Sequence, residues 1–175
     1  MNTSDKRKHP PKPRDNPRGC AAKPSVTFGL RAKDLDPEEI TSLLGIKASY
    51  AFKRGEKYRT RIDKDRYGIR KYPFGVWQLR SEECIVSDDF KEHVDCLARL
   101  LEPKRAQIGA LLAREGMYVD VRLWIESYEN VYGFTLPSRQ VLTLASLCHE
   151  INVSVILGEL GQAEGAHHDL EAASE

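Results

Sequence analysis

The 175-residue sequence lacks several features that identify common classes of protein. It has no apolar run near the roughly 18 residues that cross a membrane, so an integral membrane protein is not expected. Its four cysteines form no C-x-x-C pair, which argues against the common zinc ribbons and against a disulfide scaffold. The glycine-rich loops that bind phosphates and the G-x-S-x-G elbow of hydrolases are also missing. We therefore expect no cofactor, no metal and no enzymatic activity.

The net charge is only +1, but the charges are distributed unevenly along the chain. Residues 1–23 carry seven Lys or Arg, two Asp and four Pro, with few apolar residues, so residues 1–24 are predicted to be a disordered basic tail. No apolar signal-peptide core follows the basic residues, which favours a cytoplasmic protein. Residues 159–175 carry five acidic residues and no Lys or Arg, and are predicted to be a disordered acidic tail. A single domain is expected at residues 25–158.

Alternation of apolar and polar residues predicts the strands of this domain. It is present at 26–31 and at 75–80, and it is longest at 119–126. Residues 131–136 are predicted to return from that strand as the second half of a hairpin. A last strand is expected at 151–157.

Capping residues and helical spacing predict the helices between the strands. The first is the clearest, because Asp36 is suited to the N-cap, Pro37 to the first helical position and Gly45 to the left-handed residue after the end. Leu35 is placed to pack against Ile40 as a hydrophobic staple. The predicted helices span 36–45, 88–101, 103–116 and 137–148.

This order predicts an α+β fold with an antiparallel sheet and helices on one face of the sheet. A ferredoxin-like arrangement of two β-α-β halves is the simplest match. Residues 46–73 show no sustained period and are predicted to be extended, irregular chain with one short hairpin.

Several segments together resemble a known family. They are the helix and its cap at 35–46, the turn at 53–56, the strand at 75–79 and the helix end at 100–103. The chain resembles the bacterial family known as domain of unknown function 4279 over roughly residues 25–158. The resemblance implies a small bacterial cytoplasmic domain, of a kind sometimes suspected of partner binding or toxin immunity. It implies no activity, cofactor or catalytic residue.

Two groups of reactive residues are interpreted as structural. Cys148 precedes His149 and Glu150, but adjacent helical residues point about 100° apart, so Cys148 is expected to be a small buried apolar side chain. His93 and Asp95, with Cys96, have no metal-ligand spacing and are expected on a solvated helix face.

A basic and aromatic segment is the first candidate for function. Residues 47–80 carry eleven Lys or Arg against three acidic residues. Three interpretations are open: a solvated loop whose cations balance the acidic remainder of the domain, a surface for an acidic protein partner, and a nucleic-acid site that uses stacking and phosphate contacts.

The polar face of the sheet is the second candidate. Trp124 alternates out of phase with Val121 and Leu123, so it is expected on this face, whereas Trp77 is expected in the core. A Trp among charged side chains is typical of an interface hot spot, although packing of Trp124 under a tail or under residues 46–73 is the alternative. The favoured function is a non-enzymatic protein-binding module with an immunity-type or regulatory partner, and the alternative is a nucleic-acid-binding domain that uses residues 46–74. The predicted partner-binding residues are Arg31, Lys53, Arg54, Arg80, Asp120, Arg122, Trp124 and Glu126.

Overall fold

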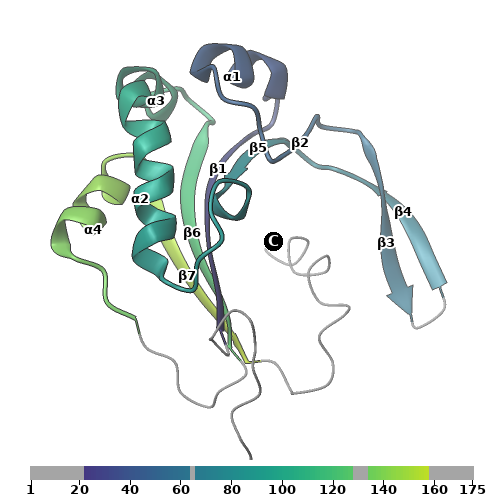
Figure 1. The fold of residues 1–175 in the computed structure, drawn as a ribbon. Helices are drawn as coiled ribbons and strands as arrows, with labels where there is room; N and C mark the ends of the chain where they lie inside the picture. The colour runs from purple at the N-terminus through teal and green to yellow at the C-terminus, as the bar shows by residue number, and fades with distance from the viewer. Residues whose placement is uncertain (1–21, 64–65, 128–133, 158–175) are drawn as a thin grey trace, which may run out of the picture.

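A computed structural model describes residues 22–63, 66–127 and 134–157. Within these ranges the chain folds as a mixed α+β domain (Figure 1). Most of the two predicted tails lies outside the described residues. The first strand begins at Ala22, so residues 22–24 belong to the sheet and not to the tail in which the sequence placed them.

Five strands form the main sheet in the order β2-β5-β1-β6-β7. All neighbouring strands are antiparallel except β6 and β7, which are parallel. Two further strands, β3 and β4, pair only with each other among the described residues. The strands are β1 (Ala22–Ala32), β2 (Tyr50–Phe52), β3 (Lys57–Asp63), β4 (Arg66–Lys71), β5 (Gly75–Arg80), β6 (Tyr118–Ser127) and β7 (Glu150–Leu157).

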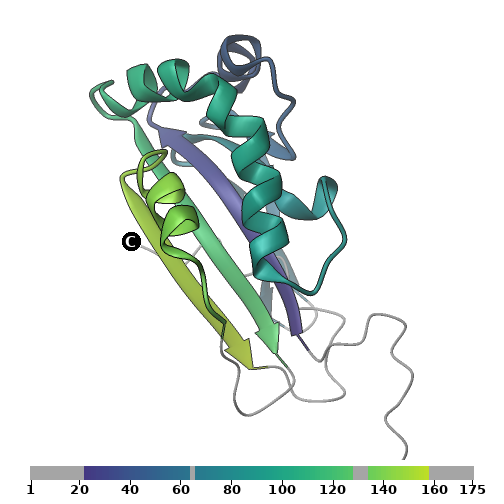
Figure 2. The ribbon, with the colours of Figure 1, turned by 60° about the vertical axis from the view of Figure 1, so that its left-hand side comes forward.

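The α-helices lie on one face of the main sheet, where Figure 2 shows α2 and α4 crossing in front of the strands. Short 3-10 turns follow β5 (η1, Ser81–Glu83) and link α2 to α3 (η2, Glu102–Lys104). The combination of a predominantly antiparallel sheet with helices on one side confirms the predicted fold class. The α-helices are α1 (Pro37–Leu44), α2 (Phe90–Leu101), α3 (Arg105–Leu112) and α4 (Ser138–Ala145).

The first helix begins and ends where its capping residues predict. The Asp36 side chain accepts a hydrogen bond from the backbone N–H of Glu38 at 3.0 Å, and Pro37 follows as the first helical residue. Gly45 ends the helix with φ of 64°, a left-handed conformation that costs a glycine little. Leu35 and Ile40 are both buried in the core cluster, as the predicted staple requires.

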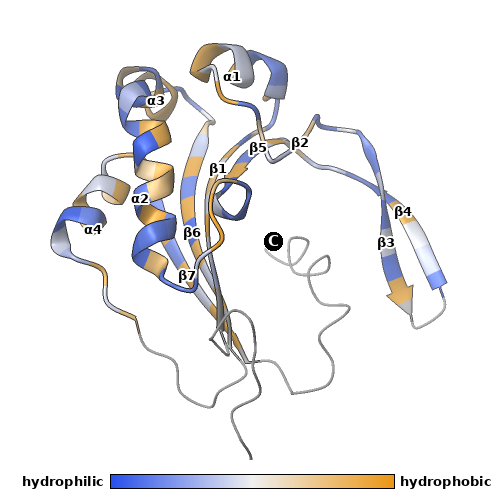
Figure 3. Cartoon of the chain, in the orientation of Figure 1, coloured by the Kyte–Doolittle hydropathy of each residue, from blue (hydrophilic) through white to orange (hydrophobic). Residues whose placement is uncertain are grey.

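The core forms between the helices and the inward residues of the strands. Figure 3 shows hydrophobic and hydrophilic residues alternating along β6 and around α2, so that one side of each element is apolar. Val26, Phe28 and Leu30 of β1 are at most 1% exposed. Trp77 is fully buried, as predicted, and its Nε1 donates a hydrogen bond to Thr41 Oγ1 at 3.0 Å. This bond satisfies the indole N–H inside the core.

The end of the chain pairs differently from the prediction. The predicted hairpin at 117–136 is wrong in its described part, because residues 134–136 are not a strand and β6 pairs with β1 and β7. Phe134 instead stacks on Phe90, with ring centroids 4.7 Å apart, as the chain approaches α4. Helix α4 is the crossover that allows β7 to lie parallel to β6.

The strand order also differs from the ferredoxin-like one. In this sheet β1 is antiparallel to both of its neighbours, β5 and β6. Within the described ranges, only β6-α4-β7 forms a parallel β-α-β unit between adjacent strands. The local sequence pattern defines each strand, but the direction of its neighbour depends on tertiary contacts.

Residues 46–73 are more regular than predicted. Strand β2 extends the main sheet, while β3 and β4 form a long hairpin that we call the arm. Figure 1 shows the arm on the side of the main sheet away from α2 and α4. Both faces of the arm contain polar residues, so its sequence lacks the alternation that identifies a half-buried strand.

Candidate functional site

The candidate site is the face of the main sheet that the described helices leave uncovered, which we call the open face. The strand registers align five residues in a central row across this face, one from each strand. A second row contains Arg80, Thr27, Arg122 and Asn152, and Ser154 lies opposite Trp124. Arg80, Arg122 and Trp124, three of the predicted site residues, therefore lie on this face. The central row consists of Tyr50, Gln78, Gly29, Asp120 and Glu150.

Gly29 provides space for charged side chains at the centre of this row. A Cβ atom at Gly29 would lie 2.5 Å from Oδ1 of Asp120 and 3.2 Å from Nη2 of Arg122. Asp120 is therefore packed against β1 and is only 5% exposed, with its Oδ2 3.3 Å from Nε of Arg122. Burial raises the pKa of Asp120, while Arg122 and Arg31 oppose this rise.

Arg31 connects charged and aromatic residues on the same face. Its guanidinium carbon lies 4.3 Å from the centroid of the Tyr118 ring, within cation–π range. The Tyr118 hydroxyl donates a hydrogen bond to Glu150, and this bond raises the pKa of Tyr118. The Glu150 carboxylate thus has an internal partner on β6.

Trp124 lies on the open face between two small residues. Its strand neighbours are Ser25 on β1 and Ser154 on β7. The Trp124 side chain is half-buried, in contrast to the fully buried Trp77. A large aromatic side chain flanked by serines offers contact area that a partner can use. Nearby, the guanidinium carbon of Arg80 lies 5.4 Å from the centroid of the Tyr50 ring.

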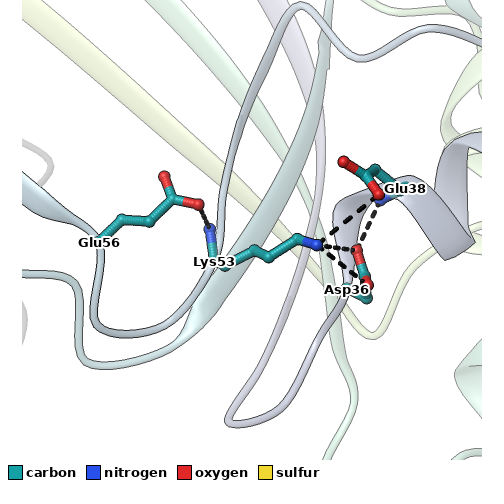
Figure 4. A network of polar contacts seen from close by, with 4 residues as sticks. All are labelled: Asp36, Glu38, Lys53 and Glu56. Atoms are coloured by element: carbon teal, nitrogen blue, oxygen red, sulfur yellow. Dashed lines mark hydrogen bonds and ion pairs between the residues drawn. The ribbon is translucent and has the colours of Figure 1, made fainter.

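Lys53 and Arg54 are not part of the open face. They lie in the turn after β2, where Lys53 Nζ is 3.1 Å from Asp36 Oδ1 and 3.7 Å from Glu38 Oε2 (Figure 4). Arg54 Nη1 is 3.4 Å from Asp34 Oδ1. Both cations therefore connect the base of the arm to the start of α1. Lys53 also lowers the pKa of Asp36, after the larger effect of the backbone N–H of Glu38.

The remaining predicted site residue is Glu126. Its backbone lies in β6 opposite Lys23 of β1, and its side chain is outside the described part of the structure. The structure thus gathers five of the eight predicted residues on the open face. They are Arg31, Arg80, Asp120, Arg122 and Trp124.

One side of the arm forms an exposed basic surface. The cross-strand pairs Lys57–Lys71, Arg59–Ile69 and Arg61–Tyr67 place six side chains on one side, because neighbouring residues of a strand point to opposite faces. The guanidinium carbon of Arg59 lies 4.0 Å from the centroid of the Tyr67 ring. We call this surface the basic face of the arm, and all of its residues are exposed: Lys57, Arg59, Arg61, Tyr67, Ile69 and Lys71.

An aromatic cluster holds the base of the arm. The Tyr72 ring stacks between those of Phe52 and Tyr58, with centroid separations of 3.3 and 4.4 Å. The hydroxyl groups of Tyr72 and Tyr50 are 2.7 Å apart and hydrogen-bonded. The cluster therefore joins β2 of the main sheet to both strands of the arm. Its aromatic residues stack on one another, so fewer ring faces are left to stack with nucleic-acid bases than the number of aromatic residues in the sequence indicates.

The potentially reactive side chains serve structural roles. Contrary to the prediction of a solvated helix face, His93 is 2% exposed and Cys96 is 6% exposed. The Nε2–H of His93 donates to the Ser87 carbonyl at 2.9 Å, so Nδ1 accepts from the Ser81 hydroxyl at 2.7 Å. Ser81 is fully buried and its Oγ also accepts the backbone N–H of Val26, so this Ser–His pair connects β1, η1 and α2.

Cys148 is buried, as predicted. Its thiol donates to the Leu144 carbonyl, and burial raises its pKa to about 11, which disfavours the reactive thiolate. Among the described residues, no three His, Cys, Asp or Glu side chains come together in a way that could hold a metal ion.

A groove on the opposite side of the molecule was not predicted. It has a volume of about 590 Å³ and lies between α2 and α4. Its lining includes both acidic and basic side chains, among them Glu92, Asp95, Arg99 and Arg139. The Nε2 of Gln140 donates there to the Lys91 carbonyl and to Asp95 Oδ1. The sequence carries no local signal for this groove, because it depends on how two distant helices pack.

The geometry defines a small α+β domain with helices on one sheet face and with charged and aromatic residues on the other. The chain belongs to the family described as Domain of unknown function (DUF4279), whose model matches residues 22–158. This match confirms the family that the sequence resembles. No curated protein and no solved structure matches the chain. No helix in the described ranges has both the length and the apolar character to cross a membrane.

Proposed function

We propose that this protein is a non-enzymatic protein-binding module whose open face receives an acidic partner. The observation that carries the proposal is the open face itself, where the strand registers align charged and aromatic residues on a rigid sheet. Binding surfaces on a rigid sheet lose little conformational entropy on association. Aromatic and Arg side chains such as Trp124 and Arg31 are also the residues most often found at interface hot spots.

The charges of the open face favour an acidic partner. Asp120 is buried against Arg122, and Glu150 accepts a hydrogen bond from Tyr118, so both carboxylates have partners within the protein. The side chains of Arg31, Arg80 and Arg122 are all partly exposed. The arm on the same side of the sheet adds six Lys or Arg residues. Such a positive surface would accelerate association with an acidic protein.

Two parts of the proposal come from the family resemblance and from the composition. They are a bacterial cytoplasmic setting and an immunity-type or regulatory role. The non-enzymatic character is supported by the buried positions of Cys148 and of the Ser81–His93 pair. In neither case is the side chain accessible to a substrate.

Affinity capture with matched variants tests the open face. The full chain is used to capture proteins from a bacterial lysate treated with nuclease, and any captured protein is then measured against Arg80→Glu and Trp124→Ala. Arg139→Glu is the control, because Arg139 is exposed on the helix side and the change in charge is the same as in Arg80→Glu. We expect at least tenfold weaker binding for the open-face variants and an unchanged affinity for Arg139→Glu. Equal affinities for all four proteins would exclude the open face as the binding surface.

The basic face of the arm supports nucleic-acid binding as a second candidate function. Four of its six residues are Lys or Arg, and a two-stranded ribbon has the width to enter the major groove of DNA. If these four side chains contact phosphates, log K should fall with log salt concentration with a slope of about −3.6. Fluorescence anisotropy with duplex and single-stranded DNA tests this, with Arg59→Glu as the arm variant and Arg139→Glu as the control. The absence of binding at low salt would remove this candidate without affecting the open-face proposal.

A further inference from the structure

Strand β7 forms an edge of the main sheet that is unusual for a folded protein. Among the described residues it pairs only with β6, so the backbone groups on its other side have no strand partner there. Residues 151–157 contain no charged residue and no proline. Natural sheets usually protect such edges with Lys, Pro or a bulge, because an unprotected edge pairs with other strands.

Exposed apolar side chains accompany this edge. Val153 and Val155 lie opposite Leu123 and Ile125 of β6 and therefore belong to the helix-side face, yet they are 55% and 48% exposed. Their β6 neighbours are at most 1% exposed. Burial of β-branched side chains in this position would be favourable, at about 25 cal/mol per Å² of apolar surface.

Helix α4 adds to the same apolar strip. Arg139, Gln140 and Thr143 line the groove shared with α2, so the helical spacing directs Val141 away from α2, whereas Leu142 lies opposite the buried Leu144 and points away from the sheet. Figure 2 shows α4 between α2 and the outer edge of β7. Val141 is 42% exposed and Leu142 is 70% exposed.

The edge sequence is complementary to itself. An antiparallel pairing centred on Ser154 places Val153 of one copy opposite Val155 of the other, and Ile151 opposite Leu157. Asn152 then lies opposite Ile156, on the open-face side. The described side chains on the helix-side face, those of Ile151, Val153 and Val155, are all apolar, and no like charges oppose each other along residues 151–157.

We propose that β7 pairs antiparallel with β7 of a second copy, so that two sheets join into one ten-stranded sheet around a two-fold axis. An isologous interface of this kind requires a self-complementary patch, which the pairing centred on Ser154 provides. The net charge of +1 means that two copies repel each other little. The pairing leaves both open faces available, so the inference is independent of the proposed function.

Sedimentation velocity of the full chain, from about 1 to 100 μM, tests the association. We expect the mass to rise from 19.8 kDa toward twice that value as concentration increases. Val153→Lys and Val155→Lys should each shift this rise to at least tenfold higher concentration. Val86→Lys is the matched control, because Val86 is 79% exposed in the loop before α2 and should leave the association unchanged.

Cysteine cross-linking tests the register. In a background with Cys20 and Cys84 replaced by Ser, Ser154→Cys should form a covalent dimer with a mild copper oxidant, because the two thiols face each other at the axis. Asn152→Cys should cross-link much more slowly. A mass of 19.8 kDa at all concentrations would overturn the proposal, as would a dimer that Val153→Lys and Val155→Lys leave intact. Equal cross-linking of the two cysteine variants would overturn the register. Circular dichroism melting establishes that each variant is folded.

Discussion

Gly29→Ala tests how tightly the centre of the open face is packed. The new methyl group would meet Asp120 Oδ1 at 2.5 Å and Arg122 Nη2 at 3.2 Å, both closer than ordinary van der Waals contact. Asp120 is 5% exposed and has little space into which to move. Overpacking of this kind costs about 1–3 kcal/mol, and the lower backbone entropy of Ala in the unfolded chain returns about 0.5–1 kcal/mol. We expect a net loss of about 1–2 kcal/mol in the free energy of unfolding, because the contact is with a short, packed side chain.

Chemical denaturation and thermal melting measure this loss. For a chain of this length, about 1–2 kcal/mol corresponds to a melting temperature lower by about 2–8 °C. The matched experiment repeats Gly29→Ala in an Asp120→Ala background, where the closest contact is gone. We expect the cost of Gly29→Ala to fall below about 0.5 kcal/mol there, since the two positions are coupled through one contact. An equal cost in both backgrounds would show that the loss of stability does not come from contact between the new methyl group and Asp120.

Three further substitutions test other parts of the structure. Trp77→Ala should lower the free energy of unfolding by about 3–5 kcal/mol because the ring is fully buried, whereas Trp77→Phe, which loses mainly the bond to Thr41, should cost less in the same urea titration. Trp124→Ala should cost less than about half of the Trp77→Ala value, because the side chain is half-buried; comparable melting temperatures for the two Ala variants would place Trp124 in the core. Asp120→Asn should match the parent protein near pH 3 and become relatively more stable as the pH rises above the ordinary carboxyl pKa of 3.8. The raised pKa of Asp120 means that ionisation costs the folded state stability above that pH, so a parent protein that gains stability relative to Asp120→Asn between pH 4 and 7 would contradict this sign.

The elements that the sequence predicts well are those with a local cause. Helix α1 could be located from Asp36, Pro37 and Gly45, because each residue acts within one turn of its own position. Strand β6 could be located from its alternation, since one face of the strand packs against the helices. The placement of Trp77 in the core and of Trp124 on the open face follows from the same alternation.

His93 lies at a position whose helical spacing indicates burial. It lies three residues after Phe90 and four before Leu97, so it occupies the apolar stripe of α2. Helical spacing alone therefore predicts that His93 is buried, and the buried Ser81 hydroxyl provides the hydrogen bond that such a position requires. For a polar residue on an apolar stripe, the position in the helix indicates burial better than the residue type does.

Other features depend on contacts that the local sequence does not encode. Asp36 and Asp34, near the start of α1, form ion pairs with Lys53 and Arg54. These two cations therefore lie beside α1 and not on the open face. The parallel direction of β7 depends on the path of α4 over the sheet. The arm has no buried face along most of its length, so alternation of apolar and polar residues does not predict its strands.

The aromatic cluster has a consequence for the geometry of any complex. Because β3 and β4 form their own sheet, the angle at which the arm leaves β2 and β5 is held largely by the Phe52, Tyr58 and Tyr72 rings and by backbone hydrogen bonds between Tyr72 and the 55–56 turn. The stacked rings therefore hold the arm at a preferred angle to the main sheet. A change such as Tyr72→Leu would keep the positive charge of the arm but alter where that charge points. The aromatic cluster would therefore help to determine which spacing of charged patches on a partner fits this protein, although its rings do not contact the partner.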